Sequence, residues 1–491
     1  MEPVTAKIDA VSSALTHTSA RGWTGQPMGP AARAALAARR ASSAFASAPP
    51  RRAFSSGPSS APPAGLLLRD FLHRALTDRA AGYFAQPDAP VGRIRDPIDF
   101  PSLLGQEDYA RALDARYARL SSQWLTPVEI FQPHYARAVA AYILREHLAS
   151  HPDRPLRVYE LGGGTGTCAA NFLAHVRDAA PDVYARMSYV SVEVSRTLAD
   201  AQRRAVRATL RRDEPESSSR PNGPDGPNGP KTRATHLKPK PKGGNPTPAP
   251  HRVEVRDATD RAGWGAVDRA PCFVVALEVL DNLPHDRVAR GDDGAWTQTR
   301  VAADAAGVPF EYVEPLADPL IRRVAAVTGA SGDQPSGERG LLDAVRRAFE
   351  VATGRSDVAF VPTGAARLLD ALHDARPNHR LVAADFDALP GVRLEGANAP
   401  IVASQAPGGK TIDRDTYLED PGRADVFFPT DFRALARLDD DARGDGEEGR
   451  GRVMTTRAFM EANAVDLRAT ETASGYNPLL QDFSNTRFYL S

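Results

Sequence analysis

Cysteine is scarce in this chain of 491 residues, and long apolar runs are missing. The two cysteines, Cys168 and Cys272, lie in or beside apolar segments, which indicates buried thiols in a reducing compartment. This pattern excludes a disulfide framework or a cysteine zinc site, and we predict no metal site. No stretch approaches the roughly 18 uninterrupted apolar residues of a membrane-spanning helix. We therefore expect a soluble protein without a membrane span.

Acidic residues are missing from residues 11–69, which contain seven arginines among many alanines and serines. This composition is typical of a mitochondrial transit peptide. The stretch RRAFSS resembles a mitochondrial processing site, with cleavage expected near Ser55. We therefore predict a disordered transit peptide over residues 1–54 and a location in the mitochondrial matrix. A disordered Ala/Pro-rich tail is the alternative.

Strong basic charge is also missing, because the whole chain has a formal net charge of 0. Residues 1–54 contain seven basic and two acidic residues, so their removal would leave a net charge of −5. A mildly acidic protein is a poor candidate for general nucleic-acid binding. We expect no nucleic-acid partner.

Apolar spacing divides the rest of the chain into two regions. Amphipathic helices are predicted over residues 66–84 and 126–148, so we assign residues 55–150 to an N-terminal helical segment that serves as a substrate lid. Residues 151–491 are assigned to one α/β domain with C-terminal elaborations, because strands and helices alternate there. The predicted strands are 156–161, 187–194, 251–258 and 271–280, and the helices between them are 167–179 and 195–212. This alternation predicts parallel pairing in a doubly wound, Rossmann-like sheet.

Three polar stretches interrupt this pattern. Residues 213–250 contain almost no apolar side chains and a near-repeat of PNGP, so we predict a disordered insertion. Its basic part could contact an acidic surface. Residues 328–340 and 439–452 are predicted to be polar loops for the same reason.

The stretch VYELGGGTGTC, residues 158–168, places four glycines directly after an apolar run. Gly162, Gly164 and Gly166 would let a ligand approach the backbone closely. The glycine spacing alone also allows a dinucleotide. However, Glu160 would repel a pyrophosphate and attract a cationic ligand, which favours S-adenosylmethionine.

Acids end the next two predicted strands. Glu193 is placed to accept both ribose hydroxyls of that cofactor, and Asp257 is placed to accept the adenine amino group. Each acid alone could be a solvated group at a strand end. Three acids at consecutive strand ends, after a glycine loop, predict S-adenosylmethionine as the cofactor.

The stretch VVALEVLDNLPHDRV, residues 274–288, resembles the Asn-Glu-x-x-Asp-Ala-Leu-Pro motif of the MidA-type mitochondrial protein-arginine methyltransferases. Glu278, Asp281, Leu283 and Pro284 match the motif. Three further stretches resemble the family in the same order along the chain: DFLHRALTDRAAGYF, TPVEIFQPHYA and PGRADVFFPTDF. The resemblance covers roughly residues 66–491.

The resemblance implies a class I methyltransferase fold and dimethylation of an arginine on a complex I subunit during assembly. The sequence departs from the family at Leu277, where the family has Asn, and at Asn282, where it has Ala. The family's Asp-Tyr-Gly reads Asp385, Phe386, Asp387 here. These departures indicate a diverged branch.

The fourth predicted strand suggests a chemistry of its own. Glu278 and Asp281 could hold and polarise a guanidinium beside the cofactor, since its planar donors match carboxylates. His285 could accept a proton. The alternatives are that Asp281 and Asn282 only cap a helix, and that His285 is solvated or structural.

At the level of function, two alternatives stay open beside a protein-arginine methyltransferase. One is a non-catalytic, cofactor-binding assembly chaperone. The other is a methyltransferase that acts on a different side chain or on a small molecule. The sequence leaves the oligomeric state open.

Overall fold

The computed structural model describes residues 65–86, 90–120, 124–212, 250–291, 293–329, 358–406, 410–419, 422–446 and 449–491. The predicted transit peptide and almost all of the predicted insertion and of the loop at 328–340 lie outside these residues. None of the helices in the described ranges has the length and apolar character needed to span a bilayer.

A seven-stranded sheet with the order β14-β15-β10-β5-β2-β3-β4 forms the centre of the molecule. Its strands are β2 (Arg157–Leu161), β3 (Ser188–Glu193), β4 (His251–Val255), β5 (Cys272–Leu277), β10 (His379–Phe386), β14 (Arg452–Thr455) and β15 (Thr486–Leu490). The five strands from β10 to β4 are parallel, and β15 is antiparallel to both of its neighbours. The chain leaves β2 toward β3 and β4, then returns to β5 on the other side. This topology confirms the predicted doubly wound sheet, whose switch point lies at β2.

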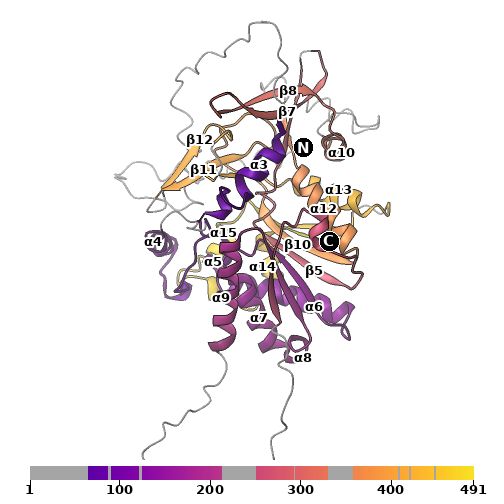
Figure 1. Cartoon of the computed structure of the whole chain (residues 1–491). Coiled ribbons are helices and arrows are strands. Elements are labelled where there is room, and N and C mark those ends of the chain that lie inside the picture. Colours follow the sequence, from indigo (N-terminus) through magenta and orange to yellow (C-terminus); the bar gives the residue numbers. More distant parts are fainter. Residues whose placement is uncertain are drawn as a thin grey trace, which may run out of the picture.

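Helices cover both faces of this sheet (Figure 1). They include α6 (His134–Ser150), α7 (Thr167–Ala179) and α9 (Arg196–Arg212), and also α10 (Pro319–Thr328), α12 (Thr363–Ala375), α13 (Phe432–Arg443) and α14 (Thr456–Asn463). Val158 of β2 packs into the core that contains α6 and α7, whereas the next residue, Tyr159, packs into the core that contains α12 and α13. Burial on both faces explains why the central strand β5, CFVVAL, is continuously apolar.

Two smaller sheets lie beyond the carboxyl ends of the parallel strands, and the sequence patterns did not predict them. One contains β1 (Leu66–Leu67), β6 (Asp286–Arg290), β7 (Trp296–Ala303), β8 (Pro309–Pro315) and β9 (Val358–Val361). The other contains β11 (Ile401–Ala406), β12 (Lys410–Arg414) and β13 (Asp425–Phe427). Helix α3 (Leu68–Thr77) runs between these sheets and the main one (Figure 1).

The N-terminal segment differs from its prediction. The helix expected over residues 66–84 is a strand, β1, followed by α3, which ends at Thr77. The helix expected over residues 126–148 is divided into α5 (Pro127–Ile130) and α6, which starts after Pro133. Proline has no backbone N–H, so a continuous helical hydrogen-bond ladder cannot pass through it.

The expected loop at residues 439–452 is also shorter than predicted. Helix α13 continues to Arg443, because Asp431 caps its first turn and Leu435 and Leu438 are buried on one face. The remaining helices are α4 (Gln106–Tyr117), α8 (Pro181–Tyr184) and α15 (Pro478–Gln481), with short 3₁₀ turns at Tyr83–Ala85, Phe100–Ser102, Arg261–Trp264 and Arg468–Thr470.

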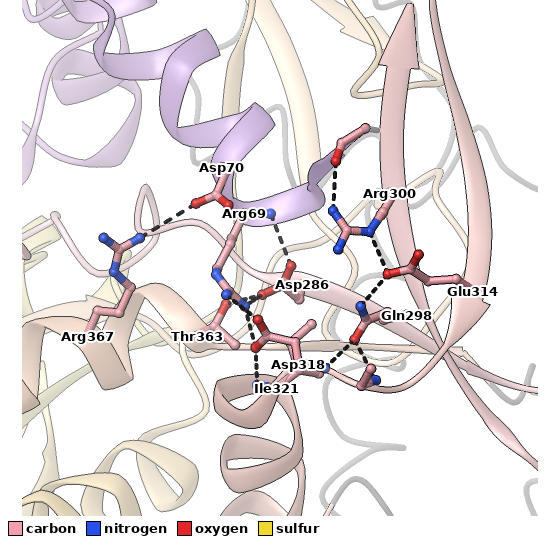
Figure 2. A network of polar contacts seen from close by, with 12 residues as sticks. Arg69, Asp70, Asp286, Gln298, Arg300, Glu314, Asp318, Ile321, Thr363 and Arg367 are labelled. Carbon is pink, nitrogen blue, oxygen red and sulfur yellow. Dashed lines mark hydrogen bonds and ion pairs between the residues drawn. The ribbon is translucent and has the colours of Figure 1, made fainter. Parts of the chain in front are cut away.

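Arg69 anchors α3 to the β6–β7 sheet (Figure 2). Its guanidinium donates to Asp286 at 2.7 Å and to Asp318 at 2.8 and 3.1 Å. Thr363 also donates to Asp286, which is completely buried. A buried carboxylate needs such partners, so α3 and the segment that ends at Asp286 are held together. The N-terminal segment is therefore an integral wall of the fold.

Candidate active site

A cavity of about 1020 Å³ opens at the carboxyl ends of the parallel strands. Gly162, Gly164, Glu193 and Asp257 line one part of it. The other part is lined by Glu278, Asp281 and Asp425, together with side chains from α3, α4 and the β11–β13 sheet. Pockets for one small ligand measure roughly 300–1000 Å³. This cavity therefore has room for a cofactor and for a second group beside it.

The glycine loop needs glycine for two physical reasons. Gly162, Gly164 and Gly166 all have positive φ values, of 57°, 52° and 87°. In addition, a Cβ atom at Gly162 would lie 2.9 Å from the Val279 side chain, and one at Gly166 would lie 2.6 Å from the Gln202 Cα. The loop therefore presents bare backbone to the cavity at Gly162 and Gly164. Gly166 instead allows close packing of α7 against α9.

Glu160 takes a different place from the one expected. Its side chain is buried beneath the loop, where it accepts a hydrogen bond from Ser191 at 3.2 Å and approaches the position of a Cβ on Gly163. Burial raises the pKa of Glu160 to about 7, although bonds from Cys168 and Ser191 oppose the shift. The cavity is lined by the glycines and not by Glu160. We therefore correct its predicted role: Glu160 supports the loop from below and does not face a ligand.

Glu193 ends β3 and lines the cavity. One carboxylate oxygen accepts the Ser195 backbone N–H at 2.9 Å, and the other accepts the Gln202 amide at 2.9 Å. Burial raises its pKa to about 7, against these hydrogen bonds. The two partners fix the carboxylate in one orientation at the end of its strand.

Asp257 follows β4 and also lines the cavity. Its Oδ1 accepts the backbone N–H and the hydroxyl of Thr259, both at 2.8 Å. Its Oδ2 lies 3.3 Å from Nε2 of His73, a residue of α3. His73 lies more than 180 residues before Asp257 in the sequence, and no motif around it predicted that it would lie beside this acid.

Glu278 occupies a strained position directly after β5. Its φ of 54° is positive, which is rare for a residue other than glycine and indicates a functional constraint. Burial and the nearby Asp385 raise the pKa of Glu278 well above its usual range. The strained turn holds this carboxyl group in the cavity wall.

Asp281 lies one turn further on and is buried. Within the described part of the chain, its Oδ1 has no hydrogen-bond partner. Burial, followed by repulsion from Asp385, Asp425 and Glu278, raises its pKa well above the usual range. Asp281 therefore has an unsatisfied acceptor in the wall of the cavity.

Asp385, at the end of β10, was not among the predicted site residues. Its Oδ2 accepts the backbone N–H groups of Val279, Leu280 and Asp281 at 2.9–3.2 Å, and its Oδ1 accepts that of Phe386. Burial raises its pKa to about 7 against these four bonds. Asp385 thus holds the turn that carries Glu278 and Asp281. A signal was present in the sequence, because Asp385 ends an apolar stretch as Glu193 does.

Asp425, at the start of β13, is a second acid of the site that the sequence patterns did not predict. Its Oδ1 accepts the side-chain amide of Asn282 at 2.8 Å, and burial raises its pKa to about 7. The ion pairs between described residues include none with Glu278, Asp281, Asp385 or Asp425. Among the described residues, these four acids therefore have no ion pair with a basic side chain.

His285 lies away from the cavity, contrary to its predicted role. Its ring stacks on Phe428 at 4.0 Å, and its Nδ1 bonds to the Leu283 carbonyl at 2.9 Å. Burial lowers its pKa to about 4. The cavity is lined by Leu283 and Pro284 instead. His285 is thus a core residue in the structure.

Aromatic side chains also line the part of the cavity that contains Glu278, Asp281 and Asp425, which we call the acceptor part. The sequence patterns did not point to these aromatic residues. They include Phe84, Tyr109, Tyr117, Trp124, Phe427 and Tyr476. Trp124 and Phe427 meet edge to face at 6.5 Å, and the Trp124 indole donates to the Tyr83 hydroxyl at 2.9 Å. These residues come from four distant segments, so they share no motif.

The glycine loop, the acids at the strand ends and the topology occur together in known proteins. Residues 138–446 match the model of a family described as "Putative S-adenosyl-L-methionine-dependent methyltransferase". The chain belongs to this family. Its cofactor is therefore S-adenosylmethionine, as the glycine loop and acids predicted.

Two crystal structures of proteins from Burkholderia thailandensis have a similar fold. One is bound to S-adenosyl-homocysteine and is 17% identical, with a TM-score of 0.51; the match covers 95% of each chain. The other is a native structure of an uncharacterized protein, 16% identical with a TM-score of 0.50, which covers 95% of this chain and 94% of that chain. No match was found among the curated proteins.

The residues present fit this cofactor. Gly162 and Gly164 line the cavity with bare backbone, which admits close approach of a ligand. Glu193 supplies a fixed acceptor for hydroxyl groups beside it. When bound, the cofactor supplies an electrophilic methyl group on a sulfonium. The acids at Glu278, Asp281 and Asp425 lie in the same cavity, where a methyl acceptor can bind.

Proposed function

We propose that this methyltransferase modifies arginine side chains of a protein in the mitochondrial matrix, and that its target is a complex I subunit during assembly. The observation that supports this proposal is a group of four acids without a cationic protein partner among the described residues: the partly buried Glu278 and the buried Asp281, Asp385 and Asp425. The resemblance to the MidA-type family supplies the matrix location and the complex I partner.

The electrostatics of the acid group favour a cationic acceptor. Burial and mutual repulsion raise the pKa of Glu278 and Asp281 well above normal, so the group takes up protons when no cation is present. A guanidinium keeps its charge at any physiological pH and presents a planar fork of donors. Its entry would pair the charges and release those protons.

Each acid has a distinct part in this proposal. Asp385 fixes the turn and cannot approach a substrate freely, since four backbone N–H groups occupy it. Glu278 and Asp281 face the cavity and would hold the guanidinium in line with the methyl group, which is mainly a positioning effect.

The transfer itself must also move a proton. The bound cofactor would supply the methyl group and leave as S-adenosyl-homocysteine. The arginine nitrogen that accepts the methyl group would have to lose one proton. A carboxylate of Glu278 or Asp281 accepts it in this scheme, because His285 packs in the core.

Cofactor carrying a labelled methyl group tests this function. The purified protein should transfer label to a protein in a matrix extract, and acid hydrolysis should yield methylated arginine. Mass spectrometry of mitochondrial proteins, with and without this enzyme in the cell, should then identify the site. Label on lysine, or in no protein, would contradict the proposal.

A small-molecule acceptor is the second candidate, and the aromatic wall of the cavity favours it. Tyr109, Trp124 and Phe427 offer flat apolar surfaces to a ring-containing substrate. Label recovered in an organic or aqueous extract, and not in protein, would identify this function.

A non-catalytic assembly chaperone is less well supported. Leu277, where the family has Asn, would favour this alternative if the family's Asn took part in transfer. However, the Leu277 side chain packs against the core that contains α6 and α7 and does not line the cavity. The departure from the family thus removes no group that faces a substrate. Cofactor binding without any transfer would favour the chaperone.

The matrix location has its own test. We propose import with cleavage near Ser55, because residues 11–69 lack acids and are rich in arginine. N-terminal sequencing of the mitochondrial form should start between about residues 50 and 66. An intact Met1 on the mature protein would contradict this proposal.

A further inference from the structure

Three metal-ligating side chains meet at the end of the main sheet that is opposite the cavity. His373 lies in the last turn of α12, His379 begins β10, and Asp439 lies on α13. One ligand atom from each lies within 4.8 Å of the other two. In the described part of the chain, they form the single group of this kind. It is separate from the cavity, because His379 and Asp385 lie at opposite ends of the same strand.

His379 supplies the strongest observation. Its Nδ1 lies 2.8 Å from the Arg376 carbonyl, and a carbonyl can only accept, so the ring proton is on Nδ1. Nε2 therefore carries a lone pair, and this atom is buried without a hydrogen-bond partner. A neutral imidazole held by a carbonyl on its other nitrogen is the usual form of a metal-bound histidine.

Asp439 supplies an oxygen toward the same point. Its carboxylate is completely buried, and Oδ1 lies 2.7 Å from Nε2 of His373. Its Oδ2 is occupied, since it accepts from the Tyr489 hydroxyl at 2.7 Å and from Arg443 at 3.1 Å. These two donors fix the carboxylate with Oδ1 toward the histidines. Oδ2 therefore has a structural role, and Oδ1 is the oxygen that could bind an ion.

We propose that His373, His379 and Asp439 bind a divalent transition-metal ion, with zinc as the ion that the donor set favours. Two imidazoles and one carboxylate are ordinary zinc ligands, and three protein ligands leave a position for water. His373 is partly exposed, with 11% of its side chain accessible, so water can reach the site.

The ion replaces the hydrogen bond between His373 Nε2 and Asp439 Oδ1. His373 would bind it as the neutral tautomer with its proton on Nδ1 and the lone pair of Nε2 toward the ion. The buried lone pair of His379 gains a partner. The positive charge of Arg443 opposes the ion, but this side chain is also paired with Asp440 at 3.0 Å. Since α12, α13 and β10 each supply one ligand, the metal would join these three elements and stabilise the fold.

Metal titration of the purified full-length protein tests this site. After chelator treatment and dialysis, Co²⁺ should bind with one ion per chain and give the visible absorption of a tetrahedral site with nitrogen and oxygen ligands. Zn²⁺ should displace it and raise the melting temperature. Replacement of a group that only orients a metal ligand costs about 10–100-fold in affinity. His379→Gln should therefore weaken binding by at least about 100-fold.

His147→Gln is the matched control. His147 is also a buried histidine whose Nε2 has no partner, but it belongs to no such group of ligands in the described residues. It should bind Co²⁺ like the wild type. The proposal fails if wild-type protein shows no tetrahedral Co²⁺ spectrum, or if His379→Gln keeps it. If His379→Gln does not fold, the wild-type spectrum and Asp439→Asn decide in the same way.

Discussion

The two parts of the cavity are built in different ways. On the cofactor side, Gly162, Gly164 and Glu193 come from one strand–loop–helix–strand segment. On the acceptor side, Asp281 meets Asp385 and Asp425, from strands more than 100 residues further along the chain. The glycine loop and Glu193 are therefore local in sequence, although Asp257 and His73 join them from elsewhere, whereas the acceptor side exists only after the sheets have packed.

The two parts also differ in how their acids are satisfied. Glu193 is held by hydrogen bonds from Ser195 and Gln202, which lie at most nine residues further along the chain. Asp281 has an oxygen with no partner among the described residues. A satisfied acid presents a fixed acceptor to a neutral hydroxyl, while an unsatisfied one attracts a cation. Under the proposed function, Glu193 would therefore contribute to cofactor binding, and Asp281 to the methyl transfer.

The largest expected effect comes from the acceptor side. Glu278→Gln keeps the size of the side chain but removes the charge that would hold the guanidinium, so turnover should fall by about 10²–10³-fold. Cofactor affinity should stay within about twofold. Labelled-methyl transfer and calorimetry measure both. Glu461→Gln, on the exposed surface of α14, is the control and should keep full activity. Near-normal transfer by Glu278→Gln would contradict its catalytic role.

Gly166→Ala tests whether the loop is required for packing on the cofactor side. Its φ is 87° and the new Cβ would lie 2.6 Å from the Gln202 backbone, so we expect a stability loss of about 1–3 kcal/mol or more. Chemical denaturation measures it. Gly265→Ala separates the causes, since Gly265 also has a positive φ of 67° but no atom within 4 Å. Equal losses in the two variants would mean that the contact with α9 does not matter.

Glu193→Gln tests the satisfied acid. Loss of its charge should weaken cofactor binding by about tenfold, or roughly 1.4 kcal/mol, because charge-assisted bonds to hydroxyls become neutral ones. Transfer at saturating cofactor should change little. Glu146→Gln, on α6 away from the cavity, is the control. If turnover fell and affinity did not, the division between the two parts would be wrong.

The pH dependence of stability tests both parts together. The pKa of Glu160, Glu193, Asp385 and Asp425 is raised to about 7 in the folded protein. Ordinary values near 4 apply to the unfolded chain, so the folded state binds more protons between pH 4 and 7. Stability should therefore be highest at the acidic end of this window and fall as pH rises through 7.

Denaturant midpoints at pH 6 and pH 8 measure this effect, and the protein without cofactor should be less stable at pH 8. Asp425→Asn removes one titrating group, so its stability should depend less on pH, by on the order of 1 kcal/mol per pH unit. Stability that rose from pH 6 to pH 8 would contradict the assignment of raised pKa values.

The smallest effect is expected for the predicted insertion at residues 213–250. Its polar composition and the slow growth of loop-closure entropy with length predict that a short Gly/Ser linker can replace it. The melting temperature should change by less than a few degrees. A larger fall would show that the segment packs on the fold.

Two predicted residues show why position along a strand does not settle a role. Glu160 and Glu193 both belong to the ends of parallel strands, yet Glu193 is the last residue of β3 and Glu160 is the last but one of β2. In the parallel register Glu160 lies beside Ser191, two residues before Glu193, so both acids point to the same face of the sheet. Glu160 lies deeper on that face, beneath the glycine loop, and this depth gives it a different role. His285 was misplaced because its stacking partner, Phe428, lies far away in the sequence.

The sequence by itself determined the doubly wound sheet, the glycine loop and the cofactor, because period, turn residues and strand-end acids are properties of short segments. Only the tertiary structure decided the acceptor side, the wall formed by α3 and the group of His373, His379 and Asp439. The physical reason is that the surroundings of a charged group or lone pair set its pKa and its hydrogen-bond partners. Burial, repulsion and missing partners arise between segments that meet only in the folded chain.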